Sequence, residues 1–333
     1  MRARDKNAET SWRPLAKIQL AQPEGLRLDG NDERLCARSE TGYIDKHFMN
    51  VPPIIIIGMH RSGTTMLARQ LEALGVFVGK RKEPNHEATL FLDIDLWLVG
   101  QCGGSWDNPQ PIRYLLENKE IRAQVSDYIY RYLLSTPRAI SYLGWQRYFR
   151  YKSPFAFDVP WGWKCPLSTF TLPIWLDLFP DAKIIHIRRH GVDVANSLRQ
   201  RGRRGVTPTL FRTLYHKLPI LHALRPKTGE FIRVRCDSLE GGLSLWEEYV
   251  AEAQRHVCAL RDRALELKYE ALLREPEEVL NQVIHFAGLS VSDEAIKRVV
   301  AWVHKERAYA YREKPELRAF ADRVPERLGA YGY

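Results

Sequence analysis

The segment GMHRSGTT, residues 58–65, combines glycine, arginine and hydroxyl side chains in an arrangement that can hold a phosphate group. Four residues separate Gly58 from Gly63, four isoleucines precede the segment, and a helical pattern follows it. Glycine amides and the first turn of a helix together attract an anion. The Walker A loop of nucleotide hydrolases has the same glycine spacing, but carries a lysine where this chain has Thr64. Arg61 supplies the positive charge instead, so we expect a phosphorylated ligand other than a hydrolysed nucleoside triphosphate.

The end of a second expected strand is also cationic. The run AKIIHIRR, residues 182–189, ends in Arg188 and Arg189 and contains no carboxylate. An enzyme that uses a magnesium–nucleotide complex needs an acidic residue to hold the metal. Neighbouring residues on a strand point to opposite sides, so only one of the two arginines can face the ligand. We expect a phosphorylated donor that is used without a metal ion, and a P-loop small-molecule kinase is the alternative.

Four segments of the chain resemble, in the same order, the sulfotransferases that use 3′-phosphoadenosine 5′-phosphosulfate (PAPS) as donor. GMHRSGTT resembles their 5′-phosphosulfate loop, in the arginine form of the tyrosylprotein sulfotransferases and many bacterial members. RHGVDVANS resembles their 3′-phosphate motif, in which seven residues separate an arginine from a serine. WKCPLSTFTLPIWLDLFPDAKIIHIRR and KYEALLREPEEVLNQVIHFAGL resemble two further segments. The likeness spans about residues 53–75 and 161–290.

The resemblance implies roles for individual residues. The residues that would bind the donor are Arg61, Ser62, Gly63, Thr64, Thr65, Arg189, Ser197 and Tyr269. Arg189 and Ser197 would hold the 3′-phosphate. Arg61 would contact the 5′-phosphosulfate and the oxygen through which the sulfate leaves. Lys164, at the position of the family's Lys-x-Pro lysine, would neutralise charge on the transferred group. Tyr269 would contact the adenosine end, although a core tyrosine explains its position as well.

Transfer to a hydroxyl also requires a group that accepts the hydroxyl proton. In the enzymes that the chain resembles, this group is a glutamate shortly after the first helix or a histidine further along. The segment KRKEPNHEATLF, residues 80–91, offers Glu83, His86 and Glu87, and its spacing departs from both patterns. We expect Glu87 to be the base, because it precedes an apolar helical segment, residues 88–98, that would hold it rigidly. Glu83 and His86 are the alternatives.

Short apolar strands that alternate with helices predict the fold. Expected strands are 54–57, 182–189 and the start of 264–273, and expected helices are 64–74, 117–134, 191–200, 243–260 and 276–289. Strands joined by helices form parallel sheets. We therefore expect an α/β fold of the P-loop type, with a parallel sheet flanked by helices. It would form a single domain over residues 51–333, after an irregular leader at residues 1–50.

The composition narrows the functional class less than the motifs do. The chain has 333 residues, a formal net charge of +10 and a pI near 9.3. This charge favours an anionic ligand, an acidic polymer or a membrane surface, so a non-catalytic polyanion-binding protein is an alternative. Five cysteines without a CxxC pair indicate a reducing compartment. No apolar run reaches the roughly 18–20 residues that span a bilayer. Because PAPS is made in the cytosol, we expect a cytoplasmic enzyme.

One segment outside the matching motifs bears on the acceptor. YLGWQRYFRYKSPFAFDVPWGW, residues 142–163, interleaves aromatic rings with Arg147, Arg150 and Lys152. Flat aromatic faces beside polar groups suit a ring-shaped acceptor that carries hydroxyls, although a buried aromatic core gives the same pattern. We expect a carbohydrate or glycoconjugate acceptor and no nucleic-acid partner, with a peptide tyrosine or a small phenol as the alternative. The basic cluster Arg199–Arg204 either reinforces the phosphate site, meets an acidic acceptor or lies in solvent.

Overall fold

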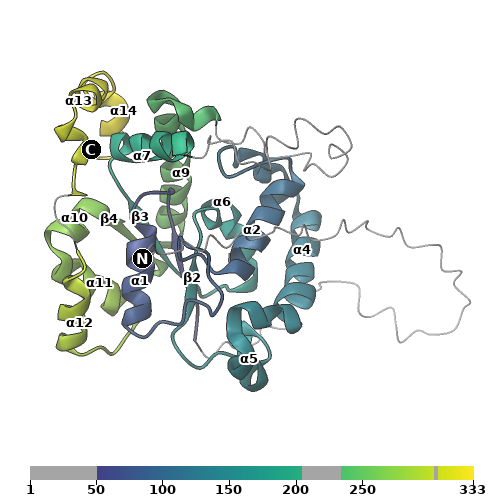
Figure 1. The fold of residues 1–333 in the computed structure, drawn as a ribbon. Helices are drawn as coiled ribbons and strands as arrows, with labels where there is room; N and C mark the ends of the chain where they lie inside the picture. Colours follow the sequence, from purple (N-terminus) through teal and green to yellow (C-terminus); the bar gives the residue numbers. More distant parts are fainter. Residues whose placement is uncertain (1–50, 205–233, 304–306) are drawn as a thin grey trace, which may run out of the picture. The chain divides into compact units, whose positions relative to one another are not determined.

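The sheet at the centre of the fold is parallel throughout (Figure 1). The computed structural model of the protein describes residues 51–204, 234–303 and 307–333, so the expected leader lies outside the described residues. The strands lie in the order β2-β1-β3-β4, with the bounds β1 Ile54–Ile57, β2 Gly162–Lys164, β3 Lys183–Arg188 and β4 Ala264–Lys268. The expected α/β fold with a parallel sheet is confirmed.

The register of the sheet brings the carboxyl ends of its strands to one edge. Ile56 on β1 is level with Lys164, the last residue of β2, and Ile57 pairs with His186 on β3. Arg188 and Lys268, the last residues of β3 and β4, pair with each other. In parallel sheets, ligands bind at the edge formed by the carboxyl ends of the strands. The register therefore decides which side chains can meet there.

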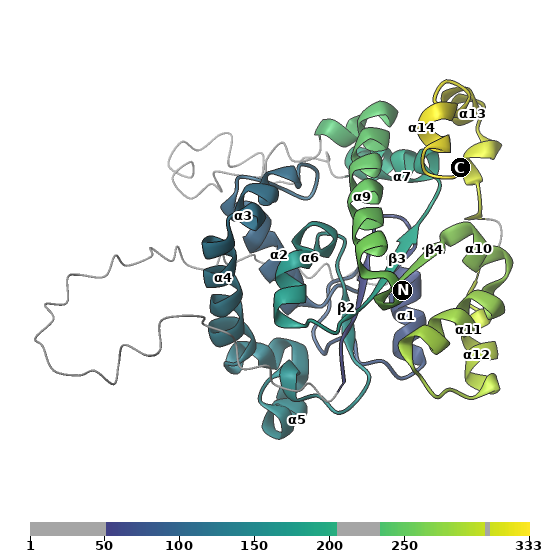
Figure 2. The ribbon, with the colours of Figure 1, turned by 180° about the vertical axis from the view of Figure 1, so that it is seen from behind.

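Helices cover both faces of the sheet, as Figures 1 and 2 show from opposite sides. Helices α1 and α11 pack on one face, and α6 and α9 pack on the other. The bounds of the helices are α1 Thr64–Ala73, α2 Thr89–Gln101, α3 Arg113–Glu117, α4 Lys119–Tyr128, α5 Ile140–Tyr151, α6 Ser168–Leu178, α7 Gly191–Arg204, α9 Leu239–Leu260, α10 Tyr269–Arg274, α11 Pro276–Ala287, α12 Asp293–Val300, α13 Pro315–Ala321 and α14 Pro325–Gly329.

Strand β1 is buried on both faces of the sheet, which explains its uninterrupted run of isoleucines. Ile54 and Ile56 belong to an apolar cluster with Leu67 and Leu71 of α1, and the cluster continues through β3, β4, α11 and α12. Full burial of a large aliphatic side chain contributes about 1.5–3 kcal/mol. The loop between β1 and α1 is thus held at both ends by the core.

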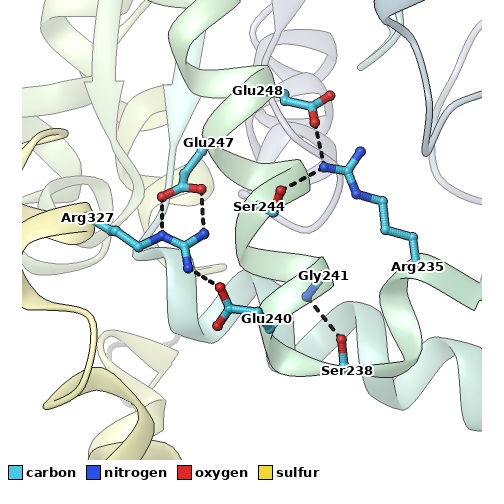
Figure 3. A network of polar contacts seen from close by, with 8 residues as sticks. All are labelled: Arg235, Ser238, Glu240, Gly241, Ser244, Glu247, Glu248 and Arg327. Atoms are coloured by element: carbon cyan, nitrogen blue, oxygen red, sulfur yellow. Dashed lines mark hydrogen bonds and ion pairs between the residues drawn. The ribbon is translucent and has the colours of Figure 1, made fainter.

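Helix α9 is fixed on both flanks by arginine side chains (Figure 3). Arg327, on α14, donates to both carboxylate oxygens of Glu247, at 2.7 and 2.6 Å, and also pairs with Glu240. On the other flank, Arg235 donates to a carboxylate oxygen of Glu248 at 2.5 Å. Because α9 packs along α7, these contacts also fix the helix that follows β3.

The expected helix over residues 117–134 is different in the structure. Helix α4 begins after Asn118, whose side-chain oxygen accepts from the backbone N–H of Ile121 at 3.0 Å. It is followed by a wider, π-helical segment, Ile129–Leu134. In the first half of the expected helix, the side chain of Ile121 is 45% exposed. The second half is buried at Ile129, Leu133 and Leu134. A π-helical turn changes which side chains share a face, and a constant helical period does not predict that change.

Two features of the described residues concern the compartment. The cysteines there are free thiols: Cys102, Cys165, Cys236 and Cys258. No helix within the described ranges has both the length and the apolar character needed to cross a bilayer. The cytoplasmic location stays a prediction.

Candidate active site

A cavity of about 520 Å³ opens at the carboxyl edge of the sheet. Its wall includes the predicted donor-binding residues Arg61, Gly63, Thr64, Thr65, Arg189 and Tyr269, and the predicted catalytic residues Glu87 and Lys164. The contributions of the strands are Arg61 after β1, Lys164 at the end of β2, Arg189 after β3 and Tyr269 after β4. The fold thus gathers residues from distant motifs around one space.

The loop between β1 and α1 has a backbone suited to an anion. Gly63 has a φ of 95°, and a Cβ atom there would lie 2.3 Å from the ring of Tyr269, so the position requires glycine. Arg61 also has a positive φ, 72°, a conformation that is rare for residues with side chains and concentrates at functional sites. Helix α1 begins at Thr64 without a side-chain cap, which leaves its first N–H groups for a ligand. The Oγ of Ser62 is buried without a partner among the described residues.

A hydrogen bond joins this loop to α7. The Nε of Arg61 donates to the Oγ of Ser197 at 2.7 Å. The serine oxygen accepts from Arg61, while the hydroxyl hydrogen can still be donated to an anion. The two motifs that the resemblance assigns to opposite ends of the donor are therefore physically connected.

The guanidinium of Arg189 is held from several sides. Its Cζ lies 4.8 Å from the centre of the Tyr269 ring. Its Nη2 lies 3.4 Å from a carboxylate oxygen of Asp193 and donates to the carbonyl of Arg307 at 3.1 Å. The backbone of Arg189 is also fixed, because Nε1 of Trp246 donates to its carbonyl at 2.9 Å. The Nε of Arg189 is buried without a partner among the described residues, and buried donors are normally paired. This arrangement fits a phosphate that completes the hydrogen bonding of Arg189.

Arg188 points away from the cavity, as the alternation of strand residues predicts. Its Nε lies 2.9 Å from a carboxylate oxygen of Glu266, and its Nη1 donates to the carbonyl of Tyr331. Arg188 therefore joins β3 to β4 and to the end of the chain. Of the two neighbouring arginines, Arg189 is the one that lines the cavity.

Lys164 and Glu87 form a buried ion pair at the cavity wall. Nζ of Lys164 donates to Oε1 of Glu87 at 3.0 Å, and the two residues are 2% and 5% exposed. Burial lowers the pKa of Lys164, and the charge of Glu87 opposes that shift. Removal of either partner would leave the other charge buried and unpaired, which costs several kcal/mol. Both groups are therefore fixed in position before any ligand binds.

The structure separates the three candidate bases. Glu87 lines the cavity, whereas Glu83 and His86 are not part of its wall. Nε2 of His86 lies 2.7 Å from a carboxylate oxygen of Glu72, and the backbone N–H of Glu83 donates to the carbonyl of Glu87 at 2.9 Å. Glu83 and His86 thus shape the loop that carries Glu87.

His60 is a cavity residue that sequence reasoning did not single out, although it stands beside Arg61 in the loop motif. Its ring packs edge-on against Trp106, with centroids 5.2 Å apart, and its Nε2 is buried without a partner among the described residues. Burial is the main cause that holds the pKa of His60 well below its usual range, and the cations Arg201 and Lys164 act in the same direction. A neutral imidazole in this place can accept a hydrogen bond from a ligand.

The basic cluster after Ser197 divides between two environments. Arg201 lines the cavity and lies over the ring of Trp106, 5.9 Å from its centre. Arg199 instead forms an ion pair with Glu316 on α13, at 2.6 Å. The side chains of the last two arginines of the cluster lie outside the described part of the structure. Arg201 alone therefore connects the described part of the cluster with the site.

The aromatic segment 142–163 does not form the cavity wall. Its core members are Tyr142, Phe157, Trp161 and Trp163. Trp145 and Phe149 are exposed on α5. The segment therefore lies outside this cavity, and its first and last parts belong to the aromatic core. Its role in acceptor binding stays a prediction.

The charge of the cavity wall indicates what it can bind. Its basic members are Arg61, Arg69, Lys164, Arg189, Arg201 and Arg307, and Glu87 is its acidic member. So many cations in one concave space create a strong attraction for an anion. In the described ranges, no three His, Cys, Asp or Glu side chains lie close enough to hold a metal ion, and transfer without a metal stays a prediction.

Comparisons with known proteins found one family model and several solved structures that are similar to the chain. A family model described as the Sulfotransferase family matches residues 52–293. Among solved structures, the chain is similar to sulfotransferase STF9 from Mycobacterium avium, with 18% identity, coverage of 76% of this chain and 67% of that one, and a TM-score of 0.39. It is also similar to a sulfotransferase from Alicyclobacillus acidocaldarius, with 19% identity, 84% and 95% coverage, and a TM-score of 0.44. Mouse sulfotransferase SULT7A1 complexed with PAP shows 16% identity, 76% and 64% coverage, and a TM-score of 0.35.

No curated protein matches the chain. The family match, in contrast, covers most of the chain and includes both the loop after β1 and the arginine–serine motif of β3 and α7. The chain belongs to the Sulfotransferase family.

Proposed function

We propose that the protein transfers a sulfuryl group from PAPS to a hydroxyl group of a carbohydrate or glycoconjugate. The observation that carries this proposal is the cationic cavity built around a phosphate-type loop. PAPS is negatively charged at its 3′-phosphate and at its 5′-phosphosulfate. Arg189 and Arg61, which the resemblance assigns to these two ends, line the same cavity. Both charged ends of PAPS could therefore be bound without a rearrangement of the fold.

The residues at hand would hold the donor in the following way. Arg189 and the hydroxyl of Ser197 would bind the 3′-phosphate, because a guanidinium matches a phosphate with two parallel hydrogen bonds. Arg61 and the amides at the start of α1 would bind the 5′ end. Tyr269 is buried against Gly63 and stacked with Arg189, so it would orient Arg189 and face the adenosine.

The chemistry would depend on fixed charges. PAPS supplies an activated sulfuryl group and leaves as adenosine 3′,5′-bisphosphate (PAP). Lys164 and Arg61 would stabilise negative charge on the transferred group and on the leaving oxygen. The carboxylate of Glu87 would accept the proton of the acceptor hydroxyl. The ion pair with Lys164 sets the position of Glu87. The ammonium of Lys164 would remain beside the carboxyl group of Glu87 after that group has taken up the proton.

The acceptor class rests on the remaining positive charge. Arg69, Arg201 and Arg307 line the cavity in addition to the cations proposed for the donor. An acceptor with acidic groups and several hydroxyls, such as an acidic glycan, would use these side chains. A peptide tyrosine or a small phenol is the alternative, because the RSGTT form of the loop resembles the tyrosylprotein branch. Since the donor is made in the cytosol, we place the reaction in the cytoplasm.

Calorimetry with PAP tests the donor site without any knowledge of the acceptor. We expect the full chain to bind PAP and Arg189→Ala to weaken binding about 10- to 100-fold, because charged hydrogen bonds contribute about 1.5–3 kcal/mol. Arg199→Ala is the matched control, since Arg199 pairs with Glu316, and its affinity should equal that of the wild type. Binding of ATP with magnesium in place of PAP would favour the kinase alternative.

The acceptor is tested by transfer from labelled PAPS to a panel of oligosaccharides, phenols and tyrosyl peptides. We expect label on oligosaccharides, and more on those that carry carboxylates. Label only on phenols or peptides would exclude the carbohydrate proposal while leaving the donor proposal intact.

A further inference from the structure

Helix α5 changes from a buried to an exposed helix at Gly144. Before this residue, Tyr142 and Leu143 are buried in the core. Gly144 has φ 71° and ψ 162°, a left-handed, non-helical conformation that glycine tolerates. After it, Trp145 and Phe149 are 66% and 67% exposed. The kink thus turns the second half of α5 away from the core.

The exposed rings of this half-helix lie together rather than singly. The centroids of Trp145 and Phe149 are 6.1 Å apart, with an angle of 30° between the rings. Nζ of Lys152 lies 5.2 Å from the centre of the Phe149 ring and 5.4 Å from that of Tyr148. Large apolar side chains that are exposed side by side mark interaction sites more often than scattered ones do.

Positive charge surrounds these rings. The segment WQRYFRYK, residues 145–152, contains three basic residues and no acidic one. Arg147 and Lys152 are exposed, and the Cζ of Arg147 lies 4.2 Å from the centre of the Phe77 ring. Arg150 is paired with Asp158 at 2.7 Å. Lys80 is also exposed and lies beside Gly144. The surface therefore combines apolar rings with a net positive charge, and a partner that covers it needs both an apolar layer and negative charge.

We propose that the second half of α5 docks the protein on a membrane surface that contains anionic lipids. We name this the α5 surface: Trp145, Arg147, Tyr148, Phe149, Arg150 and Lys152. Tryptophan and tyrosine favour the headgroup level of a bilayer, where the ring is partly buried and its polar end stays in water. Basic residues beside them are attracted by anionic headgroups.

Two other partners fit the α5 surface less well. A polyanion in solution would use the cations but gain nothing from the exposed rings of Trp145 and Phe149. A bound acceptor would have to reach the cavity, and no residue of 145–152 belongs to the cavity wall. Figures 1 and 2 place α5 at the lower end of the described domain, with α7, α13 and α14 at the upper end. The proposal uses none of the residues assigned to transfer, so it does not depend on the proposed function.

Vesicle flotation with the full-length chain tests the proposal. We expect binding to phosphatidylcholine vesicles that contain phosphatidylserine, weaker binding to phosphatidylcholine alone, and a loss of binding as salt is raised. The double variant Trp145→Ser/Phe149→Ser should bind at least about tenfold more weakly, since two apolar rings no longer enter the interface. Arg147→Glu should weaken binding to anionic vesicles about fivefold or more. Tyr114→Ser, at an equally exposed aromatic on α3, is the matched control and should bind like the wild type.

Each other outcome would overturn the proposal. Failure of the wild type to float with anionic vesicles would do so, as would unchanged flotation of the double variant. Binding to heparin without binding to vesicles would assign the α5 surface to a polyanion. Self-association that the double variant abolishes would assign it to a second copy of the chain. PAP affinity, measured on the same samples, should not change in any variant, and thermal unfolding should not change in the double variant, which separates this test from that of the donor site.

Discussion

The cavity and the α5 surface both collect basic side chains, but they hold them differently. In the cavity, Lys164 is almost completely buried against Glu87, and Arg61 donates to Ser197. On the α5 surface, Lys152 is exposed and lies over two aromatic rings. Lys164 and Arg61 are thus fixed by polar partners within the fold, whereas Lys152 lies on ring faces at an exposed position.

This difference separates two uses of positive charge. Charges held in place by the fold stabilise a transition state without having to reorganise, and they act strongly where water is excluded. Exposed charges are screened by salt and contribute little to folding. The cavity cations should therefore matter for rate and stability, and the α5 cations only for attachment.

The largest expected effect is at the buried ion pair. Lys164→Met removes the cation beside the proposed reaction centre, so we expect kcat to fall about 100- to 1,000-fold. The variant also leaves Glu87 buried without its partner, which should lower the free energy of unfolding by about 3 kcal/mol or more. Lys152→Met, on the α5 surface, should change the free energy of unfolding by no more than about 0.5 kcal/mol. Steady-state kinetics and urea unfolding measure both quantities.

The double variant Lys164→Met/Glu87→Gln shows whether the stability loss comes from the unpaired charge. We expect it to be more stable than the sum of the two single variants implies, because neither site then carries an unpaired charge. If the changes in the free energy of unfolding of the two single variants simply add, Lys164 and Glu87 are not coupled. The cavity cations would then not differ in this respect from the exposed cations of the α5 surface.

The parts of the site that lie within one motif could be predicted from the sequence. The loop after β1, the strand that precedes Arg189 and the helix over 276–289 follow from local patterns. This helix ends at Gly288, which has the left-handed conformation common at that position. The pairing of Lys164 with Glu87 could not be predicted, since the two residues are 77 positions apart. Their contact depends on the register of β2 against β1, which no local pattern specifies.

The aromatic segment shows a different limit of prediction. Its composition indicates exposed and buried rings equally well, and the structure contains both, divided at Gly144. A glycine inside a helical pattern is compatible with an unbroken helix as well as with a kink. Distant contacts hold the part before the kink in the core. The backbone N–H groups of Lys80 and Arg81 donate to the carbonyls of Tyr142 and Ser141, at 2.7 and 3.0 Å, and the hydroxyl of Tyr142 donates to the carbonyl of Gly162 at 2.6 Å.

A further prediction concerns pH, because His190, the residue after Arg189, is buried. Burial lowers the pKa of His190 to about 4, from about 6.5 in the unfolded chain. Between these two pKa values, the imidazole is protonated in the unfolded chain and neutral in the folded protein. The free energy of unfolding therefore has its full value above about pH 6.5 and decreases as the pH falls towards 4. From pH 7 to pH 5 this group should reduce the free energy of unfolding by about 2 kcal/mol.

His190→Phe tests that assignment, because phenylalanine keeps the stacking on Tyr311 and cannot be protonated. We expect urea unfolding of this variant to lose about 2 kcal/mol less than the wild type over the same pH range. His285→Gln, at an exposed histidine, should follow the wild type. Equal pH dependence in all three proteins would show that His190 is not the group responsible.

The smallest expected effect is at the hydrogen bond between the two phosphate motifs. Ser197→Ala removes the oxygen that accepts from Arg61 and a hydroxyl proposed to meet the 3′-phosphate. A hydrogen bond to a charged group contributes about 1.5 kcal/mol at the lower end of the usual range, so PAP affinity should fall about tenfold. Ser141→Ala on α5 is the control, since its hydroxyl donates to the carbonyl of Arg138, at 3.0 Å, and it should leave PAP affinity unchanged.

If Arg61 relies on Ser197 for its position, Ser197→Ala should lower kcat as well as PAP affinity, whereas a serine that only touches the 3′-phosphate would lower affinity alone. Calorimetry and single-turnover kinetics on the same protein separate the two outcomes. If Ser197→Ala binds PAP like the wild type, the hydrogen bond between Arg61 and Ser197 adds nothing to donor binding. The cavity would then depend less on cations held by partners than the comparison with the α5 surface implies.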